Sequence, residues 1–175
     1  QPFYNALQSD LAARFNLEKL LKKQRLSHIT FKAPFERESI DDIKQFLEEF
    51  SQKNERTNFS IQGVGHFEKE VIFFDMSFYE QIKEFHSSFL KGLRTFPDIS
   101  FEPLDTQDKH YHITIIEREE MNSKFEEIFA FLSSSDISFD TTFDNLTLFS
   151  KREKTYQIEN TYFLNKQKYP DRLNF

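Results

Sequence analysis

Hydrophobic positions recur along this chain with two different periods, and the period changes from one segment to the next. Spacings of three and four place apolar side chains on one face of a helix. That pattern predicts helices over 3–23, 43–50, 79–93 and 122–132. Alternating apolar and polar positions instead predict strands over 28–35, 59–67, 71–76, 110–117, 137–143, 146–149 and 156–164. The mixture predicts an α+β protein with antiparallel sheets, because neighbouring strands are joined by short connections.

The same order of elements occurs in both halves of the chain. A strand containing the tripeptide His-Ile-Thr comes first, a helix follows, and paired strands end each half. The halves have little sequence in common outside these tripeptides, at 28–30 and 112–114. The repeated order predicts an internal duplication. We therefore expect residues 1–175 to form a single domain of two similar lobes.

Polar residues and glycines mark several boundaries of these elements. Ser39, followed by Asp42, stands before the second predicted helix as a capping residue, and Ser77 stands before the third. Gly63 and Gly65 interrupt the second predicted strand, and they predict a bend or a bulge there. His86 falls in the third predicted helix, where we expect a surface or boundary position.

Composition excludes several kinds of site. The chain has three Gly, which leaves no Gly-rich loop to hold a phosphate, and 23 Phe, which supply much of the core. It has no Cys, so disulfides, thiolate nucleophiles and cysteine-based zinc sites are all excluded. No apolar run is long enough to span a membrane, and no signal peptide opens the sequence. We expect a cytoplasmic protein without a membrane partner.

The charge balance limits the size of a nucleic-acid partner. Acidic residues outnumber basic ones by 29 to 23, for a net charge of −6. An acidic protein is poorly suited to long duplexes, whose binding depends on many phosphate contacts. A local pocket can still hold one or two phosphates. Composition therefore favours a small or terminal nucleic-acid substrate over a long one. We also expect the protein to be a monomer.

The two His-Ile-Thr tripeptides, here called the HIT tripeptides, carry the chemistry. Residues two apart on a strand point the same way, so His28 shares a face with Thr30, and His112 with Thr114. Two such units facing one another would hold a phosphodiester. One neutral imidazole would take a proton from the attacking oxygen, and the other, protonated, would give one to the leaving oxygen. The hydroxyls would bind the non-bridging phosphate oxygens.

Two neighbours of the HIT tripeptides are candidate groove-lining residues. Lys32 shares the strand face of the first tripeptide and would neutralise phosphate charge, although a solvated lysine at a strand end fits equally. His110 shares the face of the second tripeptide. No third ligand with recognisable spacing accompanies His110 and His112, so we expect no metal site and no cofactor. The plainer interpretation of each tripeptide alone is a strand with a structural histidine.

The segments around the HIT tripeptides resemble those of the 2H phosphoesterases, a superfamily with two His-x-Thr/Ser motifs. HITFKAPF (28–35) is similar to the first-motif segment of its LigT-like branch, which contains 2'-5' RNA ligases and RNA 2',3'-cyclic phosphodiesterases. The segment 59–76 looks like the hairpin that follows. HYHITII (110–116) and FDNLTLFSK (143–151) fall where the second motif and a late strand belong. The match covers roughly residues 25–165.

This resemblance implies a bilobal, pseudo-twofold fold with antiparallel sheets lining a central groove and helices outside. It also implies catalytic roles for His28 and His112, phosphate-binding roles for Thr30 and Thr114, and a metal-independent reaction. The implied reaction hydrolyses the 2',3'-cyclic phosphate of a nucleotide or RNA end to a 2'-phosphate, with 2'-5' RNA ligation as an additional activity. The alternatives are a 2H enzyme acting on another cyclic nucleotide or an ADP-ribose-type compound, and a nucleotide-binding module with little turnover.

Overall fold

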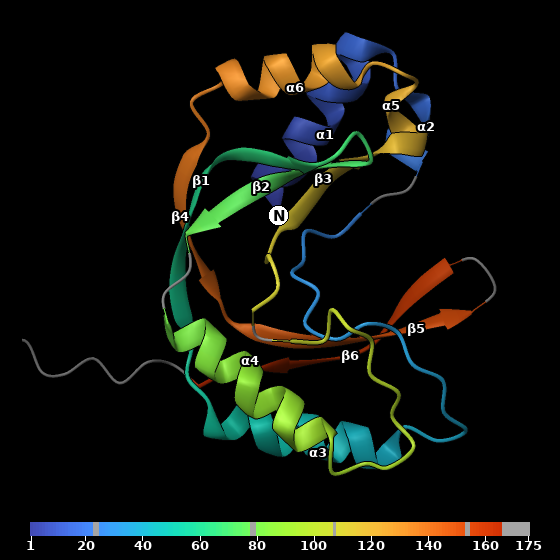
Figure 1. Cartoon of the computed structure of the whole chain (residues 1–175), viewed down its shortest axis with the longest axis vertical. Helices are drawn as coiled ribbons and strands as arrows, with labels where there is room; N and C mark the ends of the chain where they lie inside the picture. Colours follow the sequence, from blue (N-terminus) through green and yellow to red (C-terminus); the bar gives the residue numbers. More distant parts are fainter. Residues whose placement is uncertain (23–24, 78–79, 107, 153–154, 166–175) are drawn as a thin grey trace, which may run out of the picture. The chain divides into compact units, whose positions relative to one another are not determined.

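The computed structural model describes residues 1–22, 25–77, 80–106, 108–152 and 155–165 of the chain. Its helices are α1 (Pro2–Phe15), α2 (Glu18–Lys22), α3 (Asp41–Lys53), α4 (Glu80–Leu93), α5 (Arg118–Met121) and α6 (Phe125–Ser134). Its strands are β1 (Thr57–Phe67), β2 (Val71–Ser77), β3 (Ile113–Glu117), β4 (Ser138–Phe143), β5 (Asn145–Arg152) and β6 (Thr155–Phe163), as Figure 1 shows.

The chain forms two compact units, each assembled from three separate stretches. Unit 1 contains Gln1–Phe31, Ser60–Ser77 and His110–Asp140. Unit 2 contains Lys32–Phe59, Phe78–Lys109 and Thr141–Phe175. Both HIT tripeptides belong to unit 1. That the chain is one domain of two similar lobes stays a prediction.

The strands form two antiparallel sheets, which confirms the α+β class. One sheet has the order β3-β2-β1-β4 and the other pairs β5 with β6. Strand β1 is antiparallel to β2, and β2 is antiparallel to β3. The side chain of Ser60 donates to Asp140 and that of Thr142 donates to Asn58, so residue numbers fall along β1 as they rise along β4. Strand β4 is therefore antiparallel to β1 as well.

The predicted irregularity in β1 is confirmed as a bulge. The register of the β1–β2 ladder shifts between Ile61 and Val64, and Gly63 lies inside that interval with φ 81°. Left-handed backbone is readily adopted by glycine because it has no Cβ. The bulge therefore depends on glycine at this position.

Each unit has its own hydrophobic core, and phenylalanine fills much of the core of unit 2. The rings of Phe46 and Phe50 on α3 pack against Phe89 on α4 at centroid distances of 6.1 and 5.6 Å. Gly92 lets these helices approach, because a Cβ there would lie 2.5 Å from the Phe46 ring. In unit 1 most of the large, fully buried side chains are aliphatic, with Phe74 among them; the aliphatic ones include Leu11, Leu17, Leu20, Ile61, Ile72, Ile115 and Ile116.

The first predicted strand, 28–35, is wrong. These residues join neither sheet, and the larger sheet ends at β3. Burial nevertheless alternates from Leu26 to Phe31, which is the feature that suggested a strand. At this edge β3 accepts hydrogen bonds from Tyr4 and Gln8 of helix α1 instead. An alternating pattern indicates an extended backbone with one face buried. It does not indicate whether a neighbouring strand is present to form backbone hydrogen bonds with that segment.

Three further boundaries differ from prediction. The strand predicted over 110–117 begins only at Ile113, as β3. The N-terminal helix is divided into α1 and α2 at Asn16, which has φ 55°. The helix predicted over 122–132 is present as α6, but it begins only at Phe125, because the short helix α5 ends just before it at Asn122, which has φ 49°. Asparagine tolerates left-handed backbone, so it ends a helix without interrupting the hydrophobic period. Ser39 is not the N-cap of α3, since Ile40 occupies that position, but its hydroxyl accepts a 3.4 Å hydrogen bond from the backbone N–H of Asp41, the first residue of the helix.

His86 is also misplaced by the prediction. Its side chain is fully buried in α4 and not at the surface or the boundary. Within the described residues, the helices are all too short or too polar to cross a lipid bilayer.

Candidate functional site

The first HIT tripeptide lies on extended backbone in unit 1, with its histidine at the surface. His28 is exposed, and its Nδ1 lies 2.8 Å from the backbone oxygen of Leu26. Thr30 is exposed two residues further along. The side-chain oxygen of Gln1 accepts hydrogen bonds from the backbone and hydroxyl of Ser27 at 3.1 and 2.9 Å. The N-terminal end of α1 thus fixes the backbone immediately before His28.

The second HIT tripeptide has the same local arrangement. His112 precedes β3, and its Nδ1 lies 3.1 Å from the backbone oxygen of His110, again two residues earlier. A carbonyl oxygen can only accept, so the Nδ1 of each of these two histidines carries the proton. The lone pair of each neutral imidazole is therefore on Nε2, the atom that takes up or releases a proton. Thr114 is partly exposed in β3, and its backbone oxygen accepts a 2.9 Å hydrogen bond from Tyr4.

Side-chain contacts bring the two tripeptide segments side by side. Arg25 forms ion pairs with Glu117 and, at 2.9 Å, with the buried Glu120. The rings of Phe31 and Tyr111 pack against each other, with their centroids 5.9 Å apart. Phe31 lies six residues after Arg25, and Tyr111 lies six residues before Glu117. The segments are therefore antiparallel.

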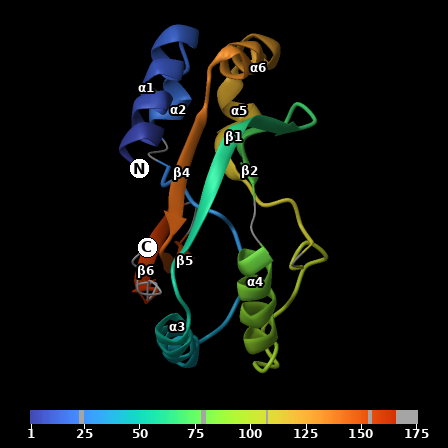
Figure 2. The same cartoon turned by 90° about the vertical axis from the view of Figure 1, so that its left-hand side faces the viewer.

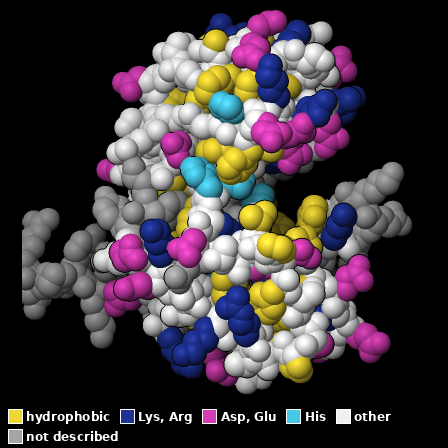
Figure 3. All heavy atoms as spheres, viewed as in Figure 1, with side chains coloured by type: hydrophobic (Ala, Val, Ile, Leu, Met, Phe, Trp, Pro, Cys, Tyr) yellow, Lys and Arg dark blue, Asp and Glu magenta, His cyan; other side chains and the backbone are white. Residues whose placement is uncertain are grey.

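Two phenylalanines of the β1–β2 hairpin support the second tripeptide. The Phe67 ring lies 4.9 Å from His112 and 5.5 Å from His110, and the Phe73 ring lies 5.2 and 5.1 Å from them. Phe73 is buried, whereas Phe67 is partly exposed. Figure 3 shows histidine and hydrophobic side chains together at the surface of this unit. The two histidines therefore share one aromatic support, as their positions two residues apart predicted.

Gly65 makes this support possible. It lies opposite Phe73 in the β1–β2 register, and a Cβ on it would lie 2.6 Å from the Phe73 ring. We predict that Gly65→Ala displaces the ring beneath His112 and lowers kcat on a 2',3'-cyclic nucleotide by about 10- to 100-fold, the usual scale for misplacing a reacting group. Steady-state kinetics on the folded variant would measure it.

A matched control and a rescue test this prediction. Gly92→Ala creates the same kind of clash, against Phe46 in unit 2, and should lower stability while leaving kcat unchanged. The double variant Gly65→Ala/Phe73→Leu should regain part of the activity, because the clash is gone although one of the two rings beneath His112 is lost with it. Equal kcat for Gly65→Ala and Gly92→Ala would show that Gly65 has no positioning role.

His110 has a second partner besides the aromatic support. Its Nε2 lies 3.6 Å from the carboxylate of Asp75 on β2, and both side chains are about half exposed. The described residues hold no group of three or more potential metal-binding side chains. Whether His110 lines a groove stays a prediction.

Lys32 belongs to unit 2 and is not a solvated lysine. Its ammonium lies 2.7 Å from Asp105, and both side chains are buried. Burial alone would raise the pKa of Asp105, but the backbone N–H of Ala33 and the Lys32 ammonium together hold that pKa below its ordinary value. Nearby, burial lowers the pKa of Lys109 to about 8. Lys32 therefore joins two loops, through Asp105, and its contact with phosphate stays a prediction.

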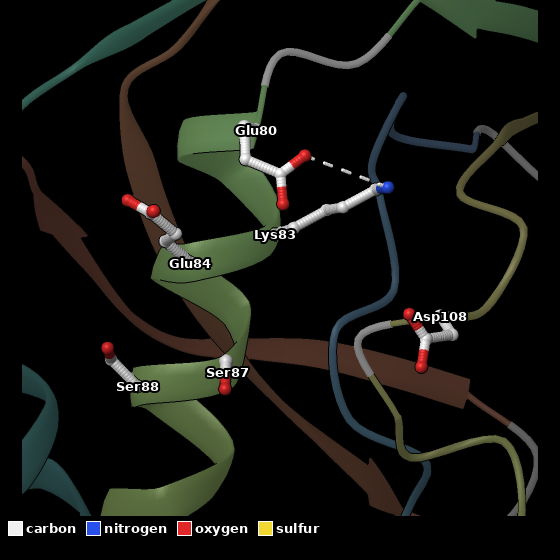
Figure 4. Close-up of a pocket in the computed structure, with 6 residues that line it drawn as sticks. All are labelled: Glu80, Lys83, Glu84, Ser87, Ser88 and Asp108. Atoms are coloured by element: carbon white, nitrogen blue, oxygen red, sulfur yellow. Dashed lines mark ion pairs between the residues drawn. The ribbon is translucent and has the colours of Figure 1, made fainter.

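A separate hollow in unit 2 does not suit a phosphodiester. It has a volume of about 510 Å³ and opens beside α4, as Figure 4 shows. Its lining residues are Glu80, Lys83, Glu84, Ser87, Ser88 and Asp108. Lys83 lies 3.9 Å from Glu80. Three carboxylates against one ammonium disfavour an anion here, so we assign the hollow no part in phosphate chemistry.

Reasoning from the sequence missed the residues that hold the tripeptides in place. Gln1, Tyr4 and Arg25 bind backbone or side chains as many as 110 positions away. A hydrogen bond between residues so far apart in the chain produces no local pattern in the sequence. Gly65 did leave a signal, since a glycine within a strand marks close approach of another group.

Comparison with known proteins identifies the family of this chain. The sequence model of the 2'-5' RNA ligase superfamily matches residues 5–155. The protein therefore belongs to the 2'-5' RNA ligase superfamily of 2H phosphoesterases, and the resemblance of its HIT segments is confirmed. No curated protein matches the chain. The crystal structure of TT0787 of Thermus thermophilus is similar over 93% of this chain and 94% of that chain, at 10% identity and a TM-score of 0.49.

Proposed function

We propose that this protein is a metal-independent phosphodiesterase that opens a 2',3'-cyclic phosphate on a nucleotide or an RNA end and leaves a 2'-phosphate. The observation that carries the proposal is the pair of histidines in one unit, His28 and His112, each donating from Nδ1 to the carbonyl two residues earlier. Two imidazoles held in the same tautomer suit one proton uptake and one proton release. Membership of the 2'-5' RNA ligase superfamily supports an enzyme of this class.

The proposed reaction is a single displacement at phosphorus. Water attacks the phosphorus atom while one neutral imidazole takes its proton at Nε2. The bond between phosphorus and the 3'-oxygen breaks, and the other imidazole, protonated, donates its proton to that oxygen. The product has a 2'-phosphate and a 3'-hydroxyl, and the protons balance because one is taken up and one is released. The same step, with a ribose 5'-hydroxyl in place of water as the nucleophile, joins two ends through a 2'-5' bond.

Thr30 and Thr114 bind the non-bridging oxygens in this proposal. A hydroxyl can donate to a phosphate oxygen without adding charge, so it steadies the negative charge that develops during attack. The exposure of Thr30 and the partial exposure of Thr114 support this role, because a phosphate can reach hydroxyls at the surface.

The test is the identity of the product and its dependence on metal. The purified protein is incubated with each of the four 2',3'-cyclic nucleotides, and phosphorus NMR separates 2'- from 3'-phosphate. We expect a 2'-phosphate at a rate that excess EDTA does not change. Loss of activity with EDTA and its return with zinc or manganese would contradict the metal-independent reaction and would make His110 and Asp75 candidate ligands.

A further inference from the structure

Two exposed side chains of unit 1 lie close to His112 and take no part in the proposed proton transfers. Phe67 is the last residue of β1 and is 38% exposed, and its ring lies 4.9 Å from that of His112. Asp75 lies on β2, the strand beside β1 in Figure 2, and about half of its side chain is exposed. An exposed ring and an exposed carboxylate next to a reacting group can bind the part of a substrate that the reaction leaves unchanged.

Contacts with Phe73 and His110 place Phe67 and Asp75 on one surface. The Phe73 ring lies 4.5 Å from the Phe67 ring. Residues two apart on a strand point the same way, so Asp75 shares the sheet face of Phe73. The His110 ring lies 5.5 Å from the Phe67 ring, and its Nε2 lies 3.6 Å from Oδ1 of Asp75. The Phe67 ring and the Asp75 carboxylate are therefore separated by one side chain.

The Asp75 carboxylate can accept further hydrogen bonds. Its Oδ1 accepts one from the backbone N–H of Met76 at 3.0 Å, and Nε2 of His110, at 3.6 Å, is beyond ordinary hydrogen-bond distance. An ionised carboxylate accepts about four hydrogen bonds and donates none. It also repels phosphate. The group that Asp75 binds is therefore an uncharged part of the substrate that presents N–H or O–H donors.

The nucleobase is the part of a nucleotide that meets both requirements. Its flat ring stacks on an aromatic side chain, and its edge carries N–H groups. Guanine presents two N–H donors side by side, at N1 and at the exocyclic amino group, so it can fill both oxygens of one carboxylate. Uracil has a single N–H between two carbonyl oxygens, and the amino groups of adenine and cytosine stand next to a ring nitrogen that only accepts. Those acceptors would face the carboxylate unfavourably.

We propose that Phe67 and Asp75 form a nucleobase subsite beside His112, in which Phe67 stacks on the base and Asp75 accepts two hydrogen bonds from guanine. All three residues belong to unit 1. This inference rests on the proposed function and adds a base preference to it. Guanosine 2',3'-cyclic phosphate is then the best of the four cyclic nucleotides as a substrate.

The first experiment measures kcat/KM of the full chain on the four 2',3'-cyclic nucleotides. Wild type should prefer the guanosine compound by about 5- to 100-fold, the usual discrimination from one bidentate contact with a base. Asp75→Asn should lose this preference, because its amide NH2 meets a donor of guanine. The variant should instead gain activity on xanthosine 2',3'-cyclic phosphate, in which an oxygen that accepts from the amide replaces the amino group. Asp136→Asn, an exposed change between α6 and β4, is the matched control and should change no value.

The second experiment tests stacking on Phe67. Phe67→Leu keeps an apolar side chain beside His112 but has no flat ring, so it should lower kcat/KM by about 5- to 100-fold, mainly by raising KM. Phe67→Tyr keeps the ring and should retain the wild-type value. Phe3→Leu removes a ring on α1 that is 50% exposed, and it should change neither constant. A fall in kcat with KM unchanged in Phe67→Leu would show that this ring supports His112 and does not stack on a base.

A binding measurement separates failure of this inference from failure of the proposed function. Calorimetric titration with the four nucleoside 2'-monophosphates needs no turnover. If wild type binds guanosine 2'-monophosphate most tightly but hydrolyses no cyclic nucleotide, the reaction fails and the subsite stands. The subsite is overturned if wild type treats the four bases alike, if it prefers another base, or if Asp75→Asn keeps the preference for guanine.

Discussion

Replacing His28 or His112 by alanine should lower the turnover of a 2',3'-cyclic nucleotide by about 100-fold or more, the usual size of a general acid–base effect. Each change removes the Nε2 that takes up or releases a proton, while the backbone carbonyl that holds the ring remains. The double variant should be little worse than either single variant, because groups that act as a unit are not additive. Thr30→Ala and Thr114→Ala should have milder effects, since each removes one neutral hydrogen bond to phosphate.

Two controls separate chemistry from local structure. His28→Asn and His112→Asn keep a side-chain N–H that can reach the same carbonyl but have no second nitrogen, so they should be as inactive as the alanine variants. His66 is exposed in the same unit, and its Nδ1 also lies 2.7 Å from a backbone oxygen, that of Glu68. It belongs to no His-x-Thr tripeptide, and His66→Ala should keep full activity.

The pH dependence tests the opposite protonation states of the pair. If one imidazole acts as base and the other as acid, the plot of kcat against pH should be bell-shaped, and both limbs should belong to the pair. A nucleotide-binding module predicts negligible turnover in wild type and histidine variants that change only affinity. Turnover and affinity measured for wild type and the four single alanine variants would decide between the two.

Asp105→Ala should cost about 3–5 kcal/mol of unfolding free energy, the usual effect of leaving one partner of a buried ion pair alone. The Asp105 carboxylate accepts hydrogen bonds from the backbone N–H groups of Ala33 and Glu102, at 2.7 and 2.8 Å, in addition to pairing with Lys32. Its removal leaves a buried ammonium and two unsatisfied N–H groups at once. Urea unfolding at pH 7, followed by circular dichroism, would measure the loss.

The control for this prediction is an ion pair at the surface. Asp98 lies 2.8 Å from Arg37, with about half of the Asp98 side chain exposed. Asp98→Ala should therefore cost less than about 1 kcal/mol. A loss of the same small size in Asp105→Ala would show that the buried pair is not a major source of stability.

The Asp105 contribution should also depend on pH. Because its pKa is lowered in the folded protein, the folded state holds the carboxylate ionised more strongly than the unfolded state does. The resulting stabilisation is fully present above the ordinary carboxyl pKa of about 4 and is lost as pH falls below it. The difference in stability between wild type and Asp105→Ala should therefore narrow below pH 4. A difference that stays constant through this range would contradict the pKa shift.

The local periods in the sequence determined most elements of this fold. Strands β1 and β2 and helix α3 were predicted because each contains a hydrophobic pattern with a single period. The bulge at Gly63 was predicted because glycine readily adopts its backbone geometry. The two HIT tripeptides could also be found from the sequence. In extended backbone, residues two positions apart point the same way, and this is a local property that needs no distant partner.

The tertiary structure alone decided which extended segments became strands and what holds the site together. Residues 28–35 have the strand pattern but join neither sheet, because helix α1 donates hydrogen bonds to β3 at that edge. Burial of His86 and the ion pair of Lys32 with Asp105 likewise depend on partners distant in sequence. The period of the hydrophobic pattern indicates which face of a segment is apolar. Which other segment packs against that face depends on the path of the whole chain, which the local pattern does not contain.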